Sequence, residues 1–142
     1  MLKGLAEIIN EVKKAKSVGQ KVKILQDNQL KELMGVYELT YDNRLTWQLP
    51  EGNPPYRPLE KSMDAQGHLY QEMKRMYIFL KGLNNVQQPK REQIFVRMLE
   101  EMDPDDALLL LEMKNRKIKG VSKKVIKQAF PGFLNEPENQ DA

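Results

Sequence analysis

Hydrophobic residues recur at intervals of three and four along most of this chain, which is the pattern of helices that bury one face. In the first segment Leu5, Ile8, Ile9 and Val12 share one face, and lysines and glutamates occupy the other. The pattern predicts helices over residues 2–16, 17–26, 29–41, 62–82, 93–102, 107–115 and 122–130. No segment alternates convincingly with a period of two. The expected fold is therefore all-α, a compact single-domain bundle of about six to seven helices.

Residues that cap helices stand in front of several of these segments. Ser17, Ser62, Asp103 and Ser122 each precede a predicted helix, and a side-chain oxygen at that position accepts a bond from an unpaired amide of the first turn. Asp103 is followed by a proline and two more acids, which is a strong signal for a helix start. The helix after it is apolar nearly all round, so we expect it to be the central one.

Residues 42–60 break the helical pattern. Four prolines in this stretch exclude a helix, because proline lacks an amide donor and restricts the residue before it. This long proline-rich loop also carries Trp47 and Tyr56. Two interpretations stay open: the aromatic rings anchor the loop to the bundle, or they form a platform on which a base or sugar stacks.

Positive charge is concentrated near the end of the chain. Residues 113–134 contain seven lysines and arginines and no acid. Cations favour the end of one helix, but at the start of the next they oppose its dipole unless an anion binds there. The pattern predicts a site for the phosphates of a nucleic acid. Its expected residues are Lys114, Arg116, Lys117, Lys119, Ser122, Lys123, Lys124 and Lys127.

The composition of the chain limits the functions that we expect. The net charge is +3, there is no cysteine, and the one histidine has no partner at metal-ligand spacing. No Gly-x-Ser-x-Gly elbow, glycine-rich phosphate loop or His-Glu-x-x-His motif is present, so we expect a non-enzymatic protein with no cofactor, no metal and no small-molecule substrate. The chain has neither a signal peptide nor an apolar run of membrane-spanning length, which predicts a cytoplasmic protein without a membrane partner. An acidic, flexible tail over residues 135–142 is expected to follow a folded domain over residues 1–134.

Several strings resemble known proteins. The segments 5–9, 19–25 and 33–41, together with 111–114, 120–122 and 129–137, resemble the N-terminal helical DNA-binding domain of T-even-type bacteriophage ATP-dependent DNA ligases. The segments 47–56 and 103–107 are similar to short tailed-phage proteins of unassigned role. The ligases adenylate the lysine of a Lys-x-Asp-Gly motif, which this chain does not contain. The resemblance implies a free-standing DNA-binding domain without ligase chemistry.

These observations together predict a phage accessory protein that binds duplex or nicked DNA in replication, repair or transcription within the host cell. A lysine-rich surface contacts phosphates rather than base edges, so strong sequence specificity is not expected. The alternative is a protein-interaction module that docks on a phage or host replication, transcription or defence protein.

Overall fold

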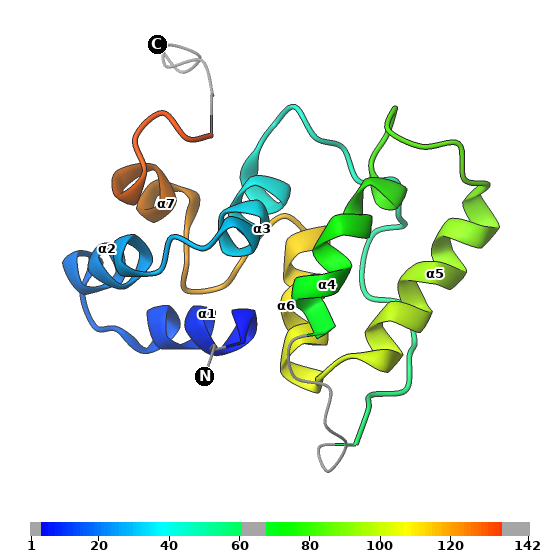
Figure 1. The fold of residues 1–142 in the computed structure, drawn as a ribbon, viewed down its shortest axis with the longest axis horizontal. Helices are drawn as coiled ribbons and strands as arrows, with labels where there is room; N and C mark the ends of the chain where they lie inside the picture. Colours follow the sequence, from blue (N-terminus) through cyan, green and yellow to red (C-terminus); the bar gives the residue numbers. More distant parts are fainter. Residues whose placement is uncertain (1–3, 61–67, 135–142) are drawn as a thin grey trace.

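A computed structural model describes residues 4–60 and 68–134, and nearly all of its regular structure is helical (Figure 1). The α-helices are α1 (Leu5–Lys14), α2 (Val18–Asp27), α3 (Lys31–Tyr41), α4 (His68–Glu72), α5 (Gln88–Glu101), α6 (Pro104–Lys114) and α7 (Lys123–Ala129). A 3₁₀ helix, η1 (Met73–Phe79), continues directly from α4. Over the two described ranges there is no strand, only two isolated bridges. The prediction of an all-α fold is confirmed.

The central position of α6 is also confirmed. It packs against α1, α3 and α5, and its Ala107, Leu110 and Met113 are fully buried. Among the leucines of this helix Leu108 is the exception, with 56% of its surface exposed. The helices α2 and α7 lie side by side (Figure 1), although about a hundred residues separate them in sequence.

Three of the predicted caps form the expected bonds. The Ser17 side chain accepts from the Gln20 amide at 3.2 Å, and the Ser122 side chain accepts from the Val125 amide at 3.2 Å. The carboxylate of Asp103 accepts from the Asp105 amide at 2.9 Å. Each bond satisfies an amide that the first turn of a helix leaves without an intrahelical partner. The predicted cap at Ser62, residues 2 and 3 of the first predicted helix and the acidic tail lie outside the described residues.

The prediction of one long helix over residues 62–82 is wrong for residues 68–82; residues 62–67 lie outside the described residues. Residues 68–72 are α-helical, but the next seven form the 3₁₀ helix, and the helical run ends at Phe79. Its end is set by the proline-rich loop, because the Gln48 amide donates to the Phe79 carbonyl at 2.7 Å and Lys81 donates to Thr46 at 2.9 Å. With three residues per turn, Phe79 takes a buried position, whereas Tyr77 is half exposed.

The loop over residues 42–60 is irregular, as predicted, and its aromatic residues are attached to the body. The Trp47 indole donates to the Leu39 carbonyl at 2.9 Å and stacks on Phe79, with 6.1 Å between ring centroids. Tyr56 is half-buried and packs against the hydrophobic core. This arrangement favours the anchor interpretation of both rings over the stacking platform.

Candidate nucleic-acid interface

The basic segment begins where α6 ends in a Schellman motif. The Lys117 amide donates to the Glu112 carbonyl at 3.1 Å, and the Arg116 amide donates to the Met113 carbonyl at 3.0 Å. This motif requires a left-handed residue, a conformation that glycine adopts most easily. Arg116 occupies that position with a φ of 66°, so the turn carries strain that other contacts must offset.

Lys114 faces inward. Its side chain is 6% exposed, and its ammonium group donates to the Pro50 carbonyl at 2.6 Å, to the Gly52 carbonyl and to the Asn115 side chain at 2.9 Å. Burial lowers the pKa of this ammonium group. The sequence predicts that Lys114 binds DNA, but in the structure its ammonium group bonds the proline-rich loop instead.

Arg116 has a similar role. Its guanidinium donates to the carbonyl of Leu39 in the last turn of α3 at 3.2 Å, and to two carbonyls at the start of the same loop, Asp42 at 2.6 Å and Leu45 at 3.1 Å. These bonds use three of the five guanidinium N–H donors, and Arg116 is half-buried, so its charge mainly holds the chain segment that enters the loop. Of the eight predicted DNA-binding residues, Lys114 and Arg116 therefore belong to the internal structure.

Residues 117–121 form the turn that follows, and side chains of neighbouring helices contact its backbone. The Tyr41 hydroxyl donates to the Val121 carbonyl at 2.5 Å and accepts from the Ile118 amide at 3.0 Å. Gly120 has a φ of +86°, and a Cβ at this position would lie 3.2 Å from Cγ of Lys13. Lys21 of α2 donates to the Gly120 carbonyl at 2.6 Å. The backbone of this turn is therefore fixed by contacts with α1, α2 and α3.

The other six predicted residues lie on or beside this turn and α7. Lys117, Lys119, Ser122, Lys124 and Lys127 are exposed, and Lys123 is half-buried. We call Lys117, Lys119, Lys123, Lys124 and Lys127 the basic surface. Because α7 has only seven residues and Ser122 already caps it, the lysine side chains rather than the helix dipole supply most of the positive potential.

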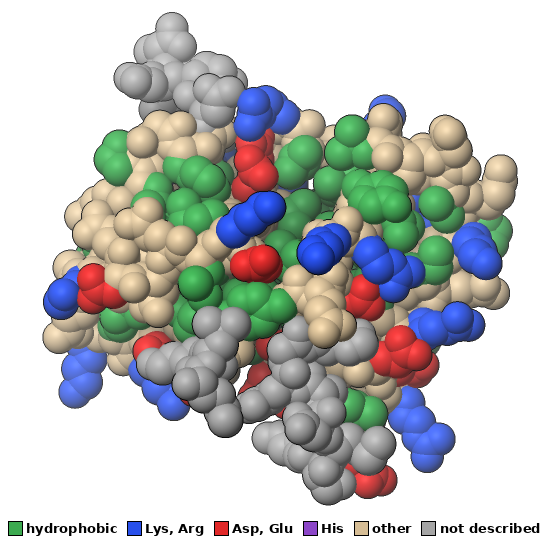
Figure 2. All heavy atoms as spheres, viewed as in Figure 1, with side chains coloured by type: hydrophobic (Ala, Val, Ile, Leu, Met, Phe, Trp, Pro, Cys, Tyr) green, Lys and Arg blue, Asp and Glu red, His purple; other side chains and the backbone are tan. Residues whose placement is uncertain are grey.

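Lys123 lies close to other positive charges. The pKa of Lys123 is lowered by burial, and next by the charges of Lys127 and Arg116. Two nearby acids are already engaged: Glu112 pairs with Lys13 at 2.8 Å, and Asp42 pairs with Arg44 at 2.7 Å. On the face shown in Figure 2, by contrast, lysines and arginines are interspersed with acids.

A groove of about 470 Å³ runs along the basic surface between α2 and residues 117–125. Its apolar walls come from Val18, Ile118 and Val125, and the lysines that line it are Lys21, Lys117 and Lys123. Val18 is 49% exposed, so part of this apolar wall faces solvent. The groove combines an apolar interior with cationic groups.

Lys21 and Val18 were not among the predicted site residues. They stand about a hundred positions before the basic segment, and only the packing of α2 on α7 brings the two regions together. No periodicity or motif in the sequence indicates this packing.

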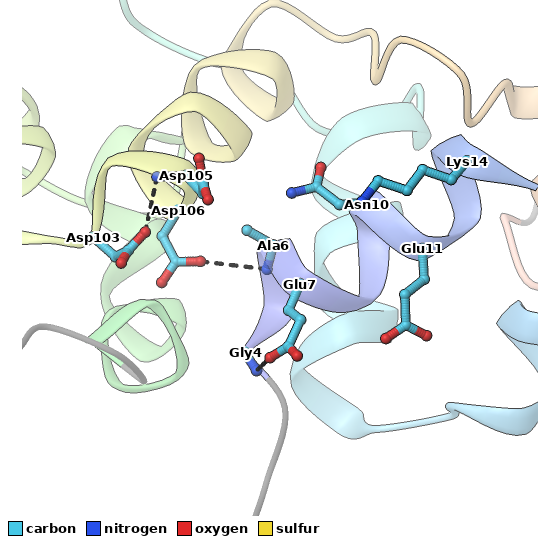
Figure 3. Close-up of a pocket in the computed structure, with 9 residues that line it drawn as sticks. All are labelled: Gly4, Ala6, Glu7, Asn10, Glu11, Lys14, Asp103, Asp105 and Asp106. Carbon is cyan, nitrogen blue, oxygen red and sulfur yellow. Dashed lines mark hydrogen bonds between the residues drawn. The ribbon is translucent and has the colours of Figure 1, made fainter. Parts of the chain in front are cut away.

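A second pocket, of about 370 Å³, has the opposite charge (Figure 3). It lies where the starts of α1 and α6 meet, and three of its carboxylates hold backbone amides: Glu7 accepts from Gly4, Asp103 from Asp105, and Asp106 from Ala6. These bonds cap helices. No group of three or more metal-ligating side chains suited to an ion was found among residues 4–60 and 68–134.

The comparisons with known proteins place the chain in a family. Residues 8–120 match the model of a family of unknown function, DUF6433, and because this match spans most of the chain, the chain belongs to that family. No curated protein matches it. Among the described residues, no helix has the length and apolar character needed to cross a membrane.

Proposed function

We propose that this member of the DUF6433 family is a non-catalytic DNA-binding protein that contacts the phosphate backbone through its basic surface. The observation that carries the proposal is the gathering of five lysines on one short turn and helix, with no acid between residues 113 and 134. Lysines that repel one another destabilise the isolated fold. Binding a polyanion relieves this repulsion and gives a reason for the arrangement.

The resemblance to the helical domain of phage DNA ligases supports the same proposal and suggests an accessory role in phage DNA replication, repair or transcription inside the host cell. The chain has no Lys-x-Asp-Gly motif, so the proposal includes no ligase step. Lysine ammonium groups act on phosphates as point charges and carry little information about base sequence. We therefore expect affinity that varies little between DNA sequences.

The test is a titration of fluorescently labelled DNA, followed by anisotropy over a series of salt concentrations. Log affinity should fall linearly with log salt, by about 0.9 for each phosphate neutralised on duplex DNA. The double variant Lys123→Glu, Lys124→Glu should lower the affinity at least about ten-fold near 0.1 M salt and reduce the slope by about 1.8. Its circular dichroism should remain helical.

A matched control reverses two charges elsewhere. Lys90 and Arg97 are exposed on α5, and Lys90→Glu with Arg97→Glu changes the net charge by the same amount. This control should bind DNA nearly as well as the unmodified chain. Weak, salt-insensitive binding, or equal losses in the two double variants, would contradict the proposal. Loss of a protein partner in a pull-down, without any DNA affinity, would instead favour the interaction module.

A further inference from the structure

The groove beside the basic surface has a composition that phosphate binding alone does not explain. A phosphate needs only cations and amides, yet the interior here is formed by Val18, Ile118 and Val125. Ile118 and Val125 are almost fully buried, whereas Val18 is half exposed, so of these three residues Val18 supplies most of the apolar surface that solvent reaches. An apolar wall that faces solvent is stabilised when a ligand with an apolar surface covers it.

The lysines restrict what that ligand is. Lys21, Lys117 and Lys123 line the same groove, so its occupant carries negative charge next to an apolar body. A nucleotide has this combination, because its base is flat and largely apolar while its phosphate is anionic. At about 470 Å³ the groove falls in the size range of sites that hold small organic groups.

The same geometry indicates whether the bound DNA is paired or single-stranded. In an intact duplex the bases are stacked and paired, and a protein that lies on the backbone meets phosphates and sugars. A base reaches an apolar groove only when it is unpaired. We infer that the groove between α2 and residues 117–125 takes the base of one unpaired nucleotide, while the lysines hold the adjoining phosphates.

This inference rests on the proposed function and adds a preference for single-stranded over intact duplex DNA. Tyr41 supports the groove but does not offer its hydroxyl, since that group already bonds the backbone of Ile118 and Val121. The contact with the base is therefore apolar. Little discrimination among the four bases is expected from it.

The test compares two single strands of equal length and charge, an oligothymidylate and an abasic strand of the same backbone, by fluorescence anisotropy at one salt concentration. The oligothymidylate should bind about five-fold more tightly, the gain expected from about 40 Å² of buried apolar surface. Val18→Ser should remove this difference and leave the affinity for the abasic strand unchanged. Because Val18 is half exposed, the variant should fold, which its thermal unfolding checks.

Leu108→Ser is the matched control, since Leu108 is 56% exposed on α6 and does not line the groove. It should keep the preference for oligothymidylate. Equal, salt-dependent binding of both strands would overturn the inference and leave the proposed function standing. A preference that survives Val18→Ser would overturn the assignment of the base to this groove. Absence of salt-dependent binding to any DNA would overturn both.

Discussion

Replacing Lys114 tests whether this cation is structural or binds DNA. Lys114→Met keeps a long unbranched side chain and removes only the ammonium group, which now donates to two loop carbonyls and to the Asn115 side chain. A hydrogen bond to a charged group contributes about 1.5–3 kcal/mol. The three hydrogen bonds together contribute less than three times this amount. Burial disfavours the charged form of Lys114, as its lowered pKa indicates, and water reaches the exposed residues Pro50 and Gly52.

We therefore expect Lys114→Met to lower the free energy of unfolding by about 2 kcal/mol, or the melting temperature by about 6 °C for a chain of this length. Differential scanning fluorimetry measures the shift. DNA affinity below the transition should remain close to that of the unmodified chain, because the ammonium group does not reach the basic surface.

Lys124→Met is the matched control. Lys124 is exposed on α7, so its replacement should move the melting temperature by no more than about 2 °C and should weaken DNA binding. The opposite result, a stable Lys114→Met variant with reduced DNA affinity, would refute the assignment of Lys114 to the loop.

Substitutions at two further positions test strain and burial inside the fold. Arg116→Ala and Arg116→Gly both remove the three carbonyl contacts, but only glycine adopts the left-handed backbone conformation without strain. Chemical denaturation should therefore show that the glycine variant is more stable than the alanine variant by about 1 kcal/mol. Equal stabilities would contradict the presence of strain. Burial raises the pKa of Tyr37, whose hydroxyl has no hydrogen-bond partner in the described part of the chain, and Tyr37→Phe keeps the stacking on Phe130. This variant should melt about 3 °C higher, and a lower melting temperature would show that the hydroxyl is satisfied in solution.

Most of the helices could be predicted from the sequence because their determinants are local. The periodicity of apolar residues marks the buried faces, and Ser17, Asp103 and Ser122 each bond an amide two or three positions ahead. The segment that ends at Phe79 could not be predicted in this way. Its 3₁₀ geometry and its end depend on hydrogen bonds to a loop about thirty residues earlier.

The candidate site was predicted in part for the same reason. A run of lysines and arginines is visible in the sequence, and charged side chains are normally assigned to the surface. Whether a given cation turns inward depends on acceptors that lie far away: Lys114 meets carbonyls more than sixty residues earlier, and Arg116 meets others more than seventy residues earlier. The groove adds Val18 and Lys21, from a helix about a hundred residues away.

The inward cations connect the proline-rich loop to the basic surface. Loops expose backbone carbonyls that no helix or strand pairs, and prolines increase their number because they supply an acceptor without a donor. Lys114 and Arg116 take five such carbonyls between Leu39 and Gly52. Both lie at the end of α6, immediately before the exposed lysines, so the loop fixes the point from which the basic turn departs. On this argument a change in the loop that releases Lys114 or Arg116 would lower the stability of the fold, whereas a change at Lys123 or Lys124 would alter DNA binding through charge and leave stability intact.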